Sequence, residues 1–140
     1  MAAGTIYRGE NLRIKINDDR VYHATSCSLS ISSNTEELSS KDIQGTEISM
    51  GNYSGTLTTD VLMADKPAAP ADYTDPGELI DLQLNKTLVD WEFTTGVVGD
   101  IVLSGKAYVT QSDLTAENNQ AATGSFTFLV SGDITRTVVV

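Results

Sequence analysis

Polar and apolar residues alternate over most of this 140-residue chain, and this period of two constrains the fold more than any other feature. The segment 26–32 reads Ser-Cys-Ser-Leu-Ser-Ile-Ser, which places four serines on one face of a strand and three apolar side chains on the other. The same alternation recurs in 12–16, 46–50, 53–62, 88–94, 100–110, 124–131 and 134–140. The pattern predicts a mainly β protein built from half-buried strands.

One segment carries the signals of a helix instead. The residues from Asp75 to Glu78 place a side-chain acceptor at the N-cap, a proline at the first helical position and a carboxylate at N3. Leucines and an isoleucine follow, so we expect a short helix that ends near Asn85. The predicted fold is an antiparallel β-sandwich or barrel of about eight strands, with one short α-helix inserted between strands.

Interruptions of the alternation predict the connections. Segment 33–45 is polar and acidic with almost no apolar anchor, so we expect a long, mobile loop there. Segment 64–73 contains Pro67 and Pro70 and should be an exposed connection. Segment 112–122 should be a polar connection, and a turn at 132–133 should separate two final strands. No second domain is indicated, so residues 1–140 should form a single one.

Charge and cysteine content exclude several classes of protein. Nineteen Asp and Glu residues against nine Lys and Arg residues give a formal charge of -10, which disfavours tight nucleic-acid binding. No apolar run approaches the ~20 residues of a membrane span, and we expect no membrane binding by this chain. The N-terminal sequence has no signal-peptide pattern, so synthesis in a cytoplasm is expected. Cys27 is the single cysteine, so neither an internal disulfide nor a zinc site is expected.

The residues give little support for catalysis. His23 is the single histidine and lies beside a predicted turn, and Cys27 lies on the apolar face of its strand. Acidic pairs are better explained as solvated faces and turns than as glycosidase or calcium sites. We therefore expect no enzyme, no cofactor and no metal site. An alternative is a monomeric carbohydrate-binding β-sandwich that uses Trp91, although Trp91 and Phe93 are expected on a core face.

The order of the elements resembles phage tail tube proteins, also called major tail proteins. The resemblance rests on the serine-alternating strand that enters the polar segment ending at Gly45, the strand from Tyr53, the short helix, the pair of strands ending at Thr110 and the closing strand 126–132. It implies a non-enzymatic subunit related in fold to type VI secretion tube proteins. Such subunits form hexameric rings that stack into a hollow tube conducting DNA from virion to host. An alternative is the inner tube of a contractile injection or type VI-like secretion system.

The resemblance also implies partners and roles for residues. The implied partners are further copies of the chain and other tail proteins: the tape measure, the terminator, and the tail tip or baseplate. DNA would pass without specific binding, and the protein would reside in the virion after synthesis in the host cytoplasm. Residues 1–10 and 134–140 would serve as assembly arms. The loop 33–45 would reach the neighbouring ring, and its candidate contact residues are Asn34, Glu36, Glu37, Leu38, Lys41 and Asp42.

Edge-strand chemistry supports assembly independently of the resemblance. A monomeric sandwich protects its edges with prolines or inward charges, which segment 26–32 lacks, so strand pairing between subunits is expected there. The candidate pairing residues are Ser28, Leu29, Ser30 and Ile31. Either Asp90 and Glu92 or the serine face of segment 26–32 is expected to line the lumen, where negative charge would keep DNA from adhering.

Overall fold

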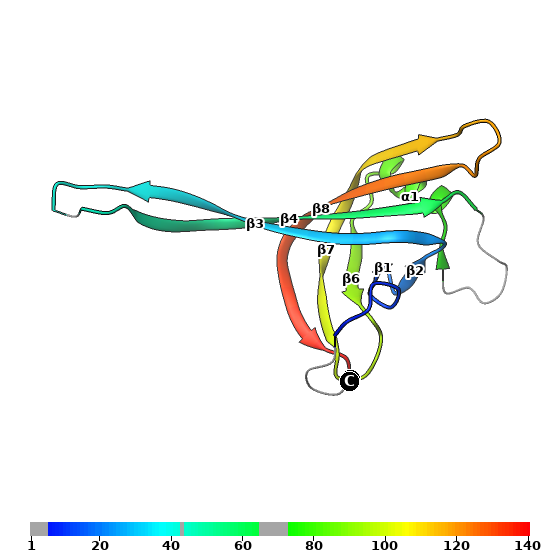
Figure 1. The fold of residues 1–140 in the computed structure, drawn as a ribbon. Coiled ribbons are helices and arrows are strands. Elements are labelled where there is room, and N and C mark those ends of the chain that lie inside the picture. Colours follow the sequence, from blue (N-terminus) through cyan, green and yellow to red (C-terminus); the bar gives the residue numbers. More distant parts are fainter. Residues whose placement is uncertain (1–5, 43, 65–72) are drawn as a thin grey trace.

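The computed structural model describes residues 6–42, 44–64 and 73–140 and contains one curved sheet with a single helix (Figure 1). In chain order the elements are β1 (Arg13–Ile16), β2 (Asp19–Val21), β3 (Ala24–Leu38), β4 (Glu47–Leu62), β5 (Tyr73–Thr74), α1 (Pro76–Leu84), β6 (Val89–Thr94), β7 (Ile101–Thr115) and β8 (Thr123–Val138). The strand order is β3-β4-β8-β7-β6-β1-β2-β5. The mainly β class with one inserted helix is confirmed, but the sheet does not close into a barrel and is not purely antiparallel, because β2 and β5 pair in parallel.

The sheet curls around one hydrophobic core. Leu57 and Phe128, from β4 and β8, belong to the same buried cluster as Ile16 and Trp91, from β1 and β6. Strands far apart in the sheet order therefore face each other across the core, and β1 approaches β3. The molecule consequently has the two-layer character of a sandwich, made from one continuous sheet, with polar residues on its two outer walls.

Local sequence explains the first hairpin and the helix. Asn17 and Asp18 adopt positive φ angles of 51° and 70°, as a type I′ turn between β1 and β2 requires. At the start of α1 the Glu78 backbone N–H donates to Asp75 Oδ1 at 2.9 Å. The predicted helix from Pro76 is confirmed, with Asn85 as its C-cap. No helix in the described part of the chain is long and apolar enough to cross a membrane.

The prediction of a long loop over 33–45 is wrong for its first half. Strand β3 continues to Leu38 and pairs with β4 up to the Leu38–Glu47 pair, so the connecting turn covers only residues 39–46. Residues 32–54 form a two-stranded hairpin that projects from the body, and we call this hairpin the arm (Figure 1). The prediction failed because the backbone hydrogen bonds between the two strands of a hairpin can form even where the side chains are polar and exposed.

The prediction of two closing strands is also wrong. Strand β8 is continuous from Thr123 to Val138, and Gly132, with a φ of +88°, lies in a bulge rather than a turn. The bulge places residues 132–134 opposite Gly105 of β7, between the Ser104–Thr135 and Lys106–Ser131 pairs. The strand bends there, so the predicted C-terminal arm 134–140 pairs with the start of β7 up to Val138.

One predicted connection is shorter than expected, and parts of two other predicted segments lie outside the described residues. Strand β7 runs to Thr115, so the polar connection predicted from residue 112 begins only after it. Of the predicted connection 64–73, residues 65–72 lie outside the described residues, as do residues 1–5 of the predicted N-terminal arm. Residues 6–10 precede β1 without joining a strand, and a turn follows in which Leu12 N–H donates to the Arg8 carbonyl.

Candidate assembly surfaces

Strand β3 is an edge strand that the body leaves open. It pairs with β4 on one side, and no strand of the described residues pairs with its other side. It is 15 residues long, and its only charges are Glu36 and Glu37 in the arm. Long edges without lysine, proline or a cover are templates for pairing with another chain. The predicted pairing residues Ser28 to Ile31 lie in the middle of this edge.

A second open edge lies along the end of β7. Strand β6 pairs with β7 only between Val102 and Ala107, so residues 108–115 have β8 on one side and no strand of the described residues on the other. The helix approaches this edge, where Gln83 Nε2 donates to the Thr110 carbonyl at 3.1 Å. Strands β3 and β4, the first half of β8 and the end of β7 thus form a four-strand layer with an edge on each side that no strand of the described residues pairs, the β7 edge being contacted by Gln83 of α1.

The four-strand layer has one bare face rich in hydroxyl groups. Directly opposite residues on neighbouring strands share a face, so the register groups these side chains together. The hydroxyl face comprises Ser26, Ser28, Ser30, Thr56, Thr58 and Thr127, together with the exposed Leu129 opposite Thr56 and Tyr108 opposite Leu129. Asp60 lies among them and accepts a hydrogen bond from Ser26 Oγ at 2.9 Å. The opposite face of this layer carries Leu57 and Phe128 and is buried in the core.

The arm carries an apolar stripe that the body leaves mostly uncovered, with Tyr53 Oη at its base accepting a hydrogen bond from the Ile134 backbone N–H of β8 at 2.9 Å. Ile48, Met50 and Tyr53 of the arm, with Ile31 immediately before it, lie on the same side of the hairpin as the core residues of β3 and β4. The exposed fractions of the three arm residues are 62%, 66% and 42%, and that of Ile31 is 49%. Side chains of this kind gain stability when they leave water, so the stripe is suited to contact with another molecule.

The predicted loop residues are distributed along the arm. Glu36, Glu37 and Leu38 are in β3, and Asn34 lies at an irregularity of the ladder, where its carbonyl faces Gly51. Lys41 and Asp42 lie in the turn at the tip. All of these side chains are exposed, and the strand register places Glu37 on the side of the apolar stripe, with Glu36 on the other side.

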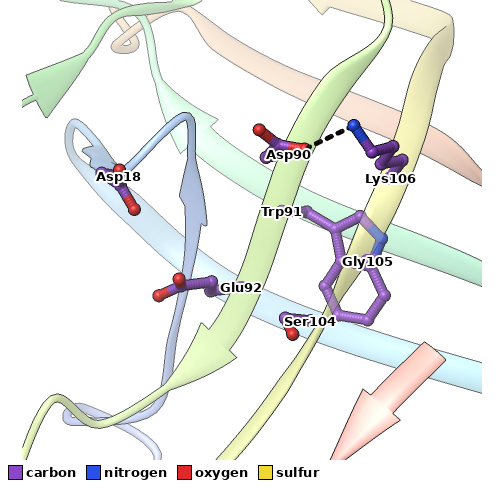
Figure 2. Close-up of a pocket in the computed structure, with 7 residues that line it drawn as sticks. All are labelled: Asp18, Asp90, Trp91, Glu92, Ser104, Gly105 and Lys106. Carbon is purple, nitrogen blue, oxygen red and sulfur yellow. Dashed lines mark ion pairs between the residues drawn. The ribbon is translucent and has the colours of Figure 1, made fainter.

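Asp90 and Glu92 lie on a different outer wall from the hydroxyl face. They project from β6 beside a cavity of about 330 Å³ that Asp18, Ser104 and Lys106 also line (Figure 2). Asp90 Oδ1 is 3.5 Å from Lys106 Nζ, and both side chains are more than half exposed. Because the sheet folds around the core, these carboxylates and the hydroxyl face are on opposite layers.

The structure also shows where the aromatic residue Trp91 and the two potentially reactive residues, Cys27 and His23, lie. Trp91 is fully buried, so the alternative of a carbohydrate platform built on it is wrong. Cys27 is half-buried against the core, with its Sγ 3.6 Å from Thr59 Oγ1. His23 is exposed, in a left-handed conformation with a φ of 53° at the entry to β3.

Two surfaces were missed at the sequence level. The apolar stripe was visible as the alternation of Ile48 and Met50, but its exposure depends on how far the hairpin leaves the body. A basic cluster of Arg13, Lys15 and Arg20 lines one cavity of about 230 Å³. The cluster forms because the first hairpin places Lys15 directly opposite Arg20. The sequence pattern places the register of two strands only to within a residue or two, so it does not predict this pair.

Among the comparisons with known proteins, the one with solved structures finds proteins similar to this chain. No protein-family model matches the chain, and no curated protein matches it. A chain of the tail of an empty gene transfer agent (GTA) particle, solved with C6 symmetry, has a TM-score of 0.76 at 15% identity, covering 95% of this chain and 100% of that one.

Two further structures share the architecture. The SPP1 tail tube has a TM-score of 0.71 at 12% identity, covering 95% of this chain and 80% of that one. A chain of the sheath-tube complex of PVC, an extracellular contractile injection system, has a TM-score of 0.65 at 16% identity, covering 98% and 95%. Agreement over nearly the whole length defines the class: the chain has the tail tube fold.

Proposed function

We propose that this protein is the structural subunit of a phage tail tube, in which hexameric rings stack into a hollow conduit for DNA. The observation that carries the proposal is the four-strand layer with an open edge on each side, in a chain with the tail tube fold. Such a layer has unlike edges, β3 on one side and the end of β7 on the other. Pairing unlike edges is a heterologous contact, which closes into a ring when the rotation fits.

The dimensions of such a ring leave an open bore. Four strands from each of six copies make a barrel of 24 strands. With ~4.8 Å between strands and a tilt of ~40°, its backbone diameter is roughly 40 to 50 Å. The C6 symmetry of the similar GTA tail supports six copies. The pairing residues are Ser28, Leu29, Ser30 and Ile31 of β3, which meet the 108–115 edge of the next copy.

The hydroxyl face is the lining of the bore in this arrangement. One face of the four-strand layer is covered by the core and the second layer, so the bare face must point inward. Serine and threonine side chains offer DNA no fixed cations. Six copies at -10 each carry about -60 before counterions, which disfavours adhesion of the phosphates. Asp90 and Glu92, on the second layer, then lie on the outside of the tube.

The remaining parts of the proposal follow from the same assignment. The subunit works without catalysis, in the virion, after synthesis in the host cytoplasm. Its partners are further copies and the tail proteins at the two ends and in the lumen: the terminator, the tail tip or baseplate, and the tape measure. The tube of an injection system is the second candidate, supported by the similarity to the PVC sheath-tube chain.

Electron microscopy of concentrated protein with two proline variants tests the proposal. The backbone N–H groups of consecutive strand residues point to opposite edges of the strand. Of the adjacent variants Leu29→Pro and Ser30→Pro, one therefore removes a hydrogen bond to β4, and the other removes a donor from the open edge. We expect hollow tubes of uniform bore from the wild type. The variant with the more stable subunit is the one that keeps its hydrogen bond to β4 and has lost a donor from the open edge. This variant should form no tubes.

The two variants serve as controls for each other, since both add one proline to the same strand. Thermal unfolding followed by circular dichroism identifies the variant that keeps its fold. A wild-type protein that stays monomeric at high concentration would contradict the proposal. Tubes from the folded proline variant would show that β3 is not the pairing edge.

A further inference from the structure

A glutamine side chain of α1 occupies part of the β7 edge in the single subunit. Gln83 Nε2 donates to the Thr110 backbone carbonyl at 3.1 Å, and Gln83 Oε1 accepts a hydrogen bond from Ser112 Oγ. We call these two hydrogen bonds the glutamine contact. A side-chain amide carries a donor and an acceptor side by side, as a backbone peptide does. The glutamine contact therefore takes the place that a pairing strand would have at this point of the edge.

The ladder between β7 and β8 explains why the Thr110 carbonyl is available to the helix. Thr110 lies at an irregularity of this ladder, where its Oγ1 donates to the Thr127 carbonyl at 3.2 Å. Strand β6 begins at Val89, opposite Ala107, so the chain that enters β6 from the end of α1 lies on the side of β7 away from β8. The Thr110 carbonyl bonds to Gln83 on that side, which is the side where another copy would pair.

Strand pairing and the glutamine contact use the same backbone group. A strand that extends a sheet lies ~4.8 Å from the edge and donates its backbone N–H groups to the outward carbonyls. At Thr110 the Gln83 amide already donates to that carbonyl, so an incoming β3 strand competes with it. The apparent affinity of the edge is then reduced to the fraction of subunits in which the glutamine contact is open.

The glutamine contact can open without loss of the core. Leu79 in the first half of the nine-residue helix is fully buried and anchors it to the body. Leu84, the last helical residue, is 72% exposed. Gln83 is half-buried between these two environments. Its side chain can therefore turn into water while Leu79 stays in place.

We propose that Gln83 is an autoinhibitory residue of assembly. In the single subunit its amide holds the Thr110 carbonyl, and it releases this carbonyl when β3 of another copy pairs with the β7 edge. The inference rests on the proposed function and adds regulation to its pairing edge. The glutamine contact stabilises the single subunit and is absent from the assembled tube, so it raises the concentration at which tubes form.

The variant Gln83→Met tests this inference. Methionine has a length and a helix propensity similar to those of glutamine, but it does not donate a hydrogen bond and accepts only weakly. Tube formation over a concentration series is measured by pelleting and electron microscopy. The critical concentration should fall about three- to tenfold, the range expected when hydrogen bonds are lost from the single subunit alone.

Urea denaturation of the monomer supplies the second readout. Gln83→Met should unfold at a lower urea concentration than the wild type, because the subunit has lost the glutamine contact. A lower stability together with easier assembly separates autoinhibition from a structural role, which would weaken the subunit without favouring tubes. Ser112→Ala removes one of the two hydrogen bonds and should shift both quantities in the same directions by less. Gln120→Met changes an exposed glutamine in the turn between β7 and β8 and should shift neither.

The outcomes distinguish the inference from the proposed function. Wild-type tubes with an unchanged or higher critical concentration for Gln83→Met would overturn the autoinhibition and leave the tube assignment intact. An equal fall for Gln120→Met would also overturn it, because the effect would then not depend on the β7 edge. If neither the wild type nor Gln83→Met forms tubes at any concentration, the tube assignment fails and the inference fails with it.

Discussion

The two halves of the β3–β4 hairpin share the same kind of backbone ladder, but the side chains on one face are buried in the core in one half and exposed in the other. In the half over the body, Leu57 and Val61 of β4 are at most 1% exposed and pack in the core. In the arm, Met50 lies on the same face of the same strand and is 66% exposed. Gly55 lies between the halves, where β8 leaves β4. The difference indicates that one half stabilises the subunit and the other is available for contacts between subunits.

The largest effect should come from the body half. Leu57→Ala removes a fully buried side chain that pairs with Phe128 across the ladder. The lost burial and the remaining cavity should lower the free energy of unfolding by about 2–5 kcal/mol. Urea denaturation of the monomer measures this change. A loss as small as that of an arm variant would show that the two halves do not differ in their contribution.

The boundary between the halves should respond next. A Cβ on Gly55 would lie 3.0 Å from Ile134 Cδ1 and from Val130 Cγ2, so Gly55→Val overpacks the point where the strands diverge. We expect a loss of about 1–3 kcal/mol in the free energy of unfolding. Gly45→Val, at a position where a Cβ meets no heavy atom within 4 Å, is the matched control. Equal losses in both variants would contradict overpacking as the cause.

A local contact in the body, away from the hairpin, should have a smaller effect. Asp75→Ala removes the acceptor of the Glu78 backbone N–H at the start of α1. Loss of an N-cap typically costs about 1 kcal/mol. Thermal unfolding of Asp75→Ala beside Asp75→Asn, which keeps an acceptor, measures the contribution of the cap. If the asparagine variant is destabilised as much as the alanine variant, capping is not the source of the effect.

Elements with strong local sequence signals were predicted, whereas elements whose extent depends on pairing with distant strands were not. The type I′ turn at Asn17 and the capped helix depend on residues within one turn, and the helix was predicted. The arm and the continuous β8 depend on partners far along the chain, so the polar segment after Ser33 and the glycine at 132 were misinterpreted as breaks. The position of Asp90 and Glu92 relative to the serine face required the curl of the whole sheet.

The smallest effect on the subunit should come from the arm, where the effect on assembly should be large. Met50→Ser changes a side chain that the body does not cover, so the free energy of unfolding should change by less than about 0.5 kcal/mol. Polymerisation, measured by pelleting and microscopy, should weaken because the apolar stripe loses area that leaves water on docking. Ser49→Ala alters the opposite face of the arm and should leave both quantities unchanged. A Met50 variant that unfolds more easily yet polymerises normally would reverse the roles assigned to the two halves of the hairpin.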